Sequence, residues 1–270
     1  MRADGLFPAP NTVIHAFFLV AAVYIYASLL RQIRSRVPEP ELIPVRKFGW
    51  PEAVLALVLS LFFLLNLLGS SSEKVSQMGN QEIILNAAFT LGLLLAVAGF
   101  LRLRRFDLNS LGGFSKIGFF RFAVTGGVLV LAAYPLIFLA ETITQRLLRG
   151  PPERQAIVDL FNTSSTLQQR ILIIVLAISI APLAEEFIFR FFLYGVLKRY
   201  FGQAIGVVVS ALLFAAVHNH LPTFAPLFVL GSCLAVAYEW SGSILVSMTM
   251  HAIFNALSLT VLAFPELIQQ

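Results

Sequence analysis

Residues 170–197 read RILIIVLAISIAPLAEEFIFRFFLYGVL, an apolar run that is interrupted by acidic and basic side chains. A helix of about 20 apolar residues crosses the bilayer core of about 30 Å, so this run is long enough to span a membrane. It also carries Pro182, Glu185, Glu186 and Arg190. An ionisable group inside a span is costly unless it faces other helices or water, and such groups usually mark functional sites. The stretch therefore predicts a membrane fold and a site within it.

The composition of the whole chain agrees with a membrane fold. Of its 270 residues, 58% are hydrophobic and 12% are charged, and the mean hydropathy is +0.85. A soluble globular protein carries about 25% charged residues, so this chain has too little polar surface to be one. The composition excludes a nucleic-acid-binding factor, a disordered tail and a secreted disulfide scaffold. Cys233 is the only cysteine, so neither an intrachain disulfide nor a cysteine-based zinc site is possible.

Eight apolar stretches predict an all-α, polytopic integral membrane protein. They cover residues 12–30, 51–70, 82–101, 120–141, 170–197, 201–219, 222–239 and 244–264. We interpret the first as a retained helix rather than a signal peptide, because it is long and arginines follow it. The segment 141–166 is expected to contain a short interfacial helix with Ile157, Leu160 and Phe161 on one face.

Basic residues alternate between the connections and predict an orientation. The connections 31–50 and 102–121 hold five Lys or Arg residues each, whereas 71–81 holds only Lys74. Cytoplasmic loops are enriched in Lys and Arg, which also accounts for the net charge of +5. We therefore expect the first and third connections to be cytoplasmic and both termini to lie outside.

The first of three polar clusters consists of Glu185, Glu186 and Arg190 within residues 170–197. Glu186 and Arg190 are four residues apart, so they share a helix face and can form an ion pair. Glu185 is rotated by about 100° from Glu186 and has no opposite charge at helical spacing. We expect Glu185 to face a cavity and to serve as a general base. The alternative is a structural ion pair with a spare acid near an interface. A bend is expected at Pro182.

The other two clusters each place a histidine four residues from a second side chain. Phe214 and His218 share one helix face, and so do His251 and Asn255. His251 and Asn255 can stabilise an oxyanion, coordinate a metal through imidazole, or join two spans by a hydrogen bond. His218, taken alone, also fits an interfacial residue. Counting about 1.5 Å per residue from the cytoplasmic end of each helix places Glu185, His218, His251 and Asn255 at depths of about 10 to 25 Å. We therefore expect the four side chains to reach one buried pocket.

Together these residue types favour amide hydrolysis without a covalent intermediate. Glu185 can take a proton from a water molecule that His218 positions. His251 and Asn255 can then donate hydrogen bonds to the oxyanion of the attacked carbonyl. If a divalent metal such as zinc is present, Glu185, His218 and His251 are its expected ligands, and the bound water is the nucleophile. The metal-binding motif His-Glu-x-x-His is absent.

In order along the chain, Glu185-Glu186-x-x-x-Arg190, Phe214-x-x-x-His218 and His251-x-x-x-Asn255 resemble the signature of the CPBP intramembrane endopeptidases. That family includes the type II CAAX prenyl endopeptidases and bacterial proteins related to abortive infection and to bacteriocin processing or immunity. The resemblance covers about a third of the chain, residues 168–260. It departs from the family at Phe191, where a glycine often follows the arginine.

The resemblance implies an eight-helix membrane enzyme that cleaves a peptide bond at or within the bilayer. It implies that Glu185 is the base, that His218 positions the water, and that His251 and Asn255 stabilise the oxyanion. Supporting roles are implied for Glu186, Arg190 and Phe214. The N-terminal helices and loops would then occupy residues 1–165 and the catalytic core residues 166–270.

The same interpretation gives expectations for location, partners and cofactor. We expect a multi-pass protein of the bacterial inner membrane that acts on a membrane-anchored peptide or protein in the lipid bilayer. No nucleic acid is expected as a partner, and a prenylated substrate is not expected in a bacterium. Both a metal-dependent and a metal-free glutamate mechanism remain open.

Two other functions are compatible with these polar groups. The fold can serve a non-catalytic membrane scaffold or a bacteriocin-immunity type protein, because the first 165 residues contain no obvious catalytic group. A proton-coupled transporter also uses buried Glu and His residues. The transporter is disfavoured because the sequence shows no internal repeat.

Overall fold

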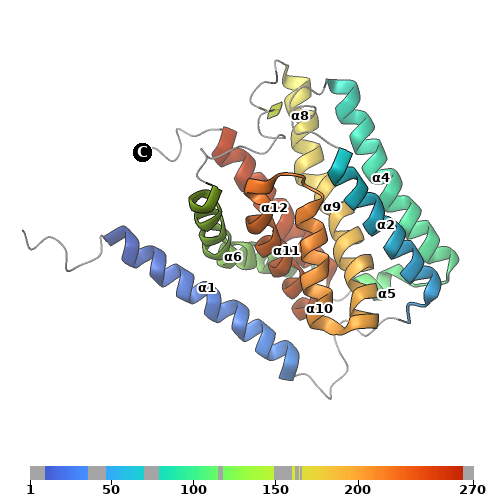
Figure 1. The fold of residues 1–270 in the computed structure, drawn as a ribbon, viewed down its shortest axis with the longest axis horizontal. Coiled ribbons are helices and arrows are strands. Elements are labelled where there is room, and N and C mark those ends of the chain that lie inside the picture. Colours follow the sequence, from blue (N-terminus) through green and yellow to red (C-terminus); the bar gives the residue numbers. More distant parts are fainter. Residues whose placement is uncertain are drawn as a thin grey trace, which may run out of the picture.

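The computed structural model describes residues 10–35, 47–69, 79–114, 118–148, 160–161, 164 and 166–263. The secondary-structure elements of these residues are all helices (Figure 1). Six of them are α1 (Pro10–Ser35), α2 (Trp50–Gly69), α4 (Asn80–Leu103), α5 (Leu108–Gly112), α6 (Phe119–Leu148) and α11 (Leu221–Ser241). The last helix is α12 (Ile244–Ala263).

Residues 170–197 lie in a run of helical segments that changes type several times. Its parts are α8 (Leu167–Val175), the π-helix η1 (Leu176–Ile180), α9 (Ala181–Glu185), the π-helix η2 (Glu186–Leu193) and α10 (Tyr194–Ala216). The run is broken at Gly202, whose φ of 84° and ψ of 169° are not helical. Glycine tolerates this positive φ because it lacks a Cβ.

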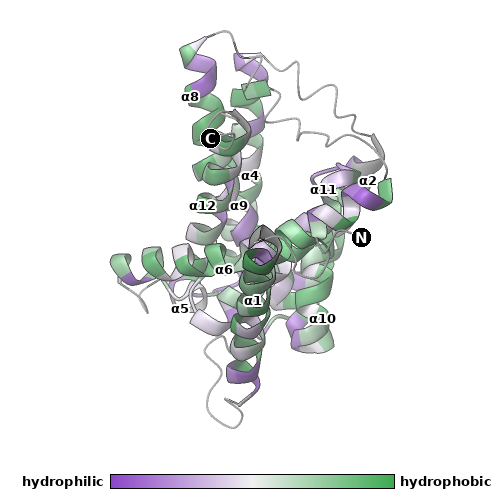
Figure 2. Ribbon diagram, turned by 90° about the vertical axis from the view of Figure 1, so that its left-hand side faces the viewer, coloured by the Kyte–Doolittle hydropathy of each residue, from purple (hydrophilic) through white to green (hydrophobic). Residues whose placement is uncertain are grey.

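The prediction of an all-α, polytopic membrane protein is confirmed, but the number of spans is lower than the predicted eight. Within the described ranges, six helices are long and apolar enough to cross a membrane, and Trp50–Asn66 is a shorter apolar helix. The six include Leu167–Ala216 as one span, which joins the predicted stretches 170–197 and 201–219, although the non-helical backbone at Gly202 separates two helices there. Figure 2 shows hydrophobic residues along most of α4, α6 and α12 and hydrophilic residues near the ends of α1, α8 and α10.

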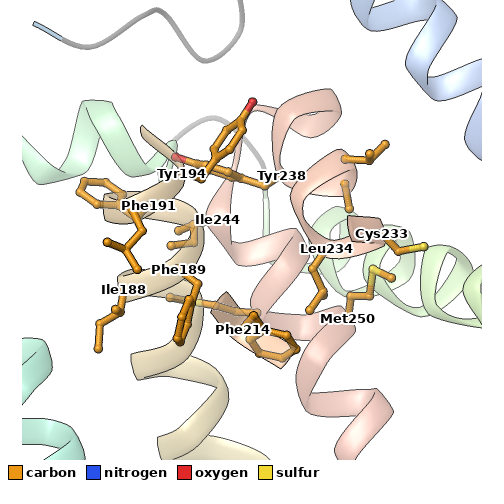
Figure 3. Packing of buried hydrophobic residues seen from close by; sticks show 14 of the residues in the cluster. Ile188, Phe189, Phe191, Tyr194, Phe214, Cys233, Leu234, Tyr238, Ile244 and Met250 are labelled. Atoms are coloured by element: carbon orange, nitrogen blue, oxygen red, sulfur yellow. The ribbon is translucent and has the colours of Figure 1, made fainter. Parts of the chain in front are cut away.

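Helix α11 forms the centre of the bundle. It packs against α10, α6, α12 and α1, and its middle residues Leu230, Leu234 and Ala237 are buried. Figure 3 shows Leu234 among the side chains that fill this core. A Cβ placed at Gly231 would lie 3.2 Å from the Cα of Ala211. The missing side chain therefore lets α10 and α11 approach closely at the level of the polar clusters.

The remaining helices pack around this centre. Helix α1 lies against α6 and α11, and the hydroxyl of Tyr26 donates a hydrogen bond to the carbonyl of Leu129 at 2.9 Å. Helix α4 runs beside α8, η1 and α9, as Figure 1 shows for α8. At the start of α2, buried Glu52 accepts a 2.8 Å bond from Nε of Arg104 at the end of α4. These contacts fix the outer helices around the C-terminal helices.

The predicted interfacial helix lies mostly outside the described residues. Ile157 is among the residues that the structure does not describe. Leu160 and Phe161 are buried against Ile173 and Leu259 of α8 and α12. At these two positions the chain therefore packs onto the helix bundle instead of presenting an apolar face to lipid.

Candidate active site

Proline and two π-helical segments shape the part of the run that carries the acidic pair. The N–H of Ala181 donates to the carbonyl of Leu176, five residues back, rather than four as in an α-helix. Pro182 follows and has no N–H to donate. The bend predicted at Pro182 is therefore a local change of helix type, which is frequent at functional sites. All eight residues of η2 are buried.

Glu186 and Arg190 form the predicted ion pair in a completely buried position. A guanidinium nitrogen of Arg190 lies 2.9 Å from Oε1 of Glu186, and the two side chains are 1% and 0% exposed. A second guanidinium nitrogen donates to the carbonyl of Gly231 on α11 at 3.3 Å. The guanidinium carbon also lies 4.1 Å from the centre of the Phe214 ring on α10. Arg190 thus connects three helical segments.

His251 lies between the two glutamates. Its Nδ1 is 3.0 Å from Oε1 of Glu186, and its Nε2 is 3.9 Å from Oε2 of Glu185. An ionised carboxylate only accepts hydrogen bonds, so Nδ1 of His251 carries the hydrogen. In the neutral ring Nε2 then presents a lone pair toward Glu185. The contact with Glu186 gives that residue a second partner that the sequence spacing did not predict.

His218 is the second histidine near Glu185. It lies in the turn after α10, where its Nδ1 donates to the carbonyl of Phe214 at 2.8 Å. Its Nε2 lies 4.0 Å from Oε2 of Glu185. The Phe214 ring packs edge-on against both imidazoles, with centroid distances of 4.9 Å to His218 and 5.5 Å to His251. Phe214 therefore lies beside both histidines and Arg190, consistent with the predicted shared face with His218.

The structure thus brings three of the four predicted groups around one point. Oε2 of Glu185 is buried and has no hydrogen-bond partner, while Nε2 of His218 and Nε2 of His251 lie 4.0 and 3.9 Å from it. Such a separation is too long for a direct hydrogen bond, and because Oε2 itself is buried, a bridging water would reach it only after a neighbouring side chain moves. His251 is 2% exposed, whereas Glu185 and His218 are 25% and 27% exposed. Glu185 and His218 are therefore the more exposed members of the site, although Oε2 of Glu185 is itself buried.

Asn255 lies one helical turn beyond His251 on α12. Its Nδ2 donates a 2.8 Å hydrogen bond to the carbonyl of Ala177 in η1. Of the three possibilities that the sequence left open, this contact is the interhelical hydrogen bond. The amide has a second hydrogen, so the contact does not use up its capacity to donate.

The arrangement does not match the geometry of a bound metal. In the part of the chain that the structure describes, no group of three or more His, Cys, Asp or Glu side chains is placed to hold a metal ion. Ligand atoms around a tetrahedral zinc with bonds of about 2.1 Å lie about 3.4 Å apart. The separations of Glu185 from His218 and His251 are 4.0 and 3.9 Å. The three predicted ligands would have to move closer together to coordinate zinc.

Comparison with known proteins places this site inside a recognised region. Residues 167–257 match the family described as type II CAAX prenyl endopeptidase Rce1-like. The chain is also similar to the membrane-embedded CAAX protease MroQ of Staphylococcus aureus (strain USA300), with 32% identity over 82 residues. That match covers 28% of this chain and 33%, about a third, of the relative. No solved structure matches the chain. All four predicted site residues lie within residues 167–257.

Proposed function

We propose that this chain, whose residues 167–257 match the Rce1-like family of type II CAAX prenyl endopeptidases, is an intramembrane endopeptidase. Its substrate is a membrane-anchored peptide or protein, and its location is the bacterial plasma membrane. The observation that carries the proposal is the convergence of one carboxylate and two imidazoles, from α9, the α10–α11 turn and α12, inside an apolar bundle. Buried ionisable groups of this kind are retained in membranes where they serve a function.

In the proposed reaction, Glu185 is the general base. A water molecule placed between Glu185 and His218 donates one hydrogen to each, because both Oε2 and the neutral Nε2 accept hydrogen bonds. Glu185 takes a proton as the water oxygen adds to the carbonyl carbon of the scissile bond. The carbon–nitrogen bond then breaks, and the protonated Glu185 returns the proton to the leaving amine. No covalent enzyme intermediate is formed.

His251 and Asn255 are the proposed donors to the oxyanion. For this role both ring nitrogens of His251 have to carry a hydrogen, so that Nδ1 donates to Glu186 and Nε2 donates to the reacting oxygen. Asn255 can use its second amide hydrogen for the same oxygen. Glu186 supports the reaction by fixing the orientation of His251, just as carboxylate partners orient functional histidines elsewhere.

Arg190 and Phe214 hold the parts of the site together. The guanidinium of Arg190 neutralises Glu186 in the dry interior and lies on the Phe214 ring. Phe214 in turn packs against both imidazoles. We therefore assign Arg190 and Phe214 structural roles that keep His218 and His251 in place.

Cleavage of a membrane-anchored peptide by the purified protein in proteoliposomes tests the proposal. The wild-type protein should cleave, and Glu185→Ala and His218→Ala should lose about 100-fold or more in rate, the usual effect of removing a general base. Glu141→Gln is a matched control, because Glu141 lies on α6 and contacts Gln145 rather than the site. The proposal is wrong if Glu185→Ala and His218→Ala cleave as fast as the wild type. A phenotype rescued by Glu185→Ala at normal protein level would instead favour the scaffold function.

A chelator distinguishes the two modes of water activation. Because the present geometry does not fit a metal, we expect cleavage to continue after treatment with 1,10-phenanthroline and dialysis. If activity is lost and is restored by zinc alone, the water is activated by a metal and the role of Glu185 as the base is incorrect.

A further inference from the structure

The π-helical turn before Pro182 leaves one backbone carbonyl without a backbone donor. The N–H of Ala181 is directed to Leu176, so it does not serve Ala177 as it would in an α-helix. The next N–H along the helix would belong to residue 182, but proline has none. The carbonyl of Ala177 therefore receives no hydrogen bond from the N–H of residue 181 or from residue 182.

The side chain of Asn255 occupies this position. Its Nδ2 donates to the Ala177 carbonyl at 2.8 Å, across the contact between α12 and η1. Proline is tolerated in membrane helices where neighbouring helices satisfy the backbone groups that it frees. The bond is partly buried, and a backbone carbonyl left unsatisfied within a membrane helix is costly, so the hydrogen bond has a clear energetic reason.

The position of this bond links it to the site. Asn255 is one turn beyond His251 on α12, and Ala177 lies eight residues before Glu185 in the same continuous helical run. The bond therefore fixes the segment that carries Glu185 against the helix that carries His251. The two groups are separated by 3.9 Å, a distance that depends on how these two segments sit against each other.

We propose that Asn255 is a positioning residue that replaces the N–H missing at Pro182 and so sets the spacing between Glu185 and His251. Its effect on the reaction rests on the proposed function, but its effect on stability does not. The role is separate from donation to an oxyanion, because it uses a different amide hydrogen and acts through Ala177.

Restoring the missing N–H tests the proposal. In Pro182→Ala, residue 182 can donate to Ala177, so Asn255 is no longer needed for that purpose. Four proteins are compared: the wild type, Asn255→Ala, Pro182→Ala and the double variant. We expect Asn255→Ala to lower the Tm in detergent by several degrees in the wild-type background and by less than half as much in the Pro182→Ala background. We also expect the kcat of the double variant to be at least about tenfold higher than the kcat of Asn255→Ala, with KM little changed.

Controls separate this role from general effects. Pro135→Ala removes a proline inside α6, and the cost of Asn255→Ala should be unchanged in that background. Pro182→Ser supplies the same N–H if Pro182→Ala does not fold. Asn255→Leu keeps much of the volume without a donor, so it should lower the Tm as much as Asn255→Ala.

Additive effects of the Pro182 and Asn255 substitutions on Tm and kcat would overturn the proposal, as would a wild-type Tm for Asn255→Leu. If the wild type does not cleave any membrane-anchored peptide, the proposed function fails. The Tm comparison still decides the role of Asn255 in that case, because it does not depend on activity.

Discussion

Arg190→Ala is expected to destabilise the protein far more than Glu185→Ala, although the two residues are only five positions apart. The guanidinium of Arg190 is 1% exposed and contacts Glu186, Gly231 and the Phe214 ring. Removing it leaves the buried charge of Glu186 without its ion-pair partner. Breaking a buried ion pair from one side costs about 3–5 kcal/mol. The Gly231 and Phe214 contacts belong to the same network, so their energies do not simply add.

Glu185→Ala provides the matched comparison. Glu185 is 25% exposed, and its buried Oε2 has no hydrogen-bond partner. Its removal leaves no opposite charge without a partner. We therefore expect Glu185→Ala to lower the free energy of unfolding by about 1 kcal/mol or less, as for most substitutions that break no buried network of contacts. Since 1 kcal/mol corresponds to about 2–4 °C in a chain of this size, Arg190→Ala should lower the Tm by about 6–20 °C and Glu185→Ala by about 2–4 °C or less.

The assay is thermal unfolding of both variants in the same detergent, followed by intrinsic fluorescence and by loss of monodisperse elution. The double variant Glu186→Leu/Arg190→Leu should recover much of the lost Tm, because apolar residues can replace a buried ion pair. It should remain inactive, since Leu cannot orient His251. Equal Tm values for Arg190→Ala and Glu185→Ala would refute the assignment of Arg190 as the structural centre of the site.

Three further predictions concern the surroundings of Glu185. His218→Ala should lower kcat by about 100-fold with little change in Tm, because its side chain is 27% exposed; a large Tm loss in detergent would show that His218 is mainly structural. Phe214→Ala should cost about 3–5 kcal/mol, measured as a Tm shift, because the ring is fully buried; an unchanged Tm would contradict this packing. Gly231→Ala should cost about 1–3 kcal/mol by overpacking, since its Cβ would lie 3.1 Å from Phe214; a raised Tm would show that α10 and α11 can separate freely.

The sequence was sufficient to predict the membrane fold and the ion pair. Charged residues in apolar stretches are rare, so Glu185, Glu186 and Arg190 were identifiable without any tertiary information. The spacing of Glu186 and Arg190 places them on one face of a helix, and the structure contains this pair at 2.9 Å. The membrane fold and the ion pair were predictable because they depend on residue type and on spacing along one helix.

The sequence was insufficient where helix geometry or tertiary contacts decide the outcome. Hydropathy predicts a boundary near Gly202, where the backbone leaves the helix, but it does not predict the π-helical segments η1 and η2. The contact of Glu186 with His251 joins residues 65 positions apart, and no helical spacing relates them. The bond from Asn255 to Ala177 depends on a π-turn, which a bend at Pro182 alone does not specify.

The most direct test of Glu185 as the general base is the single-turnover cleavage rate of Glu185→Gln, compared with that of the wild type in the same proteoliposomes. The amide keeps the size of the side chain but removes the base. We expect a rate lower by about 100-fold or more at a nearly unchanged Tm. Cleavage by Glu185→Gln at the wild-type rate would show that this carboxylate does not activate the water.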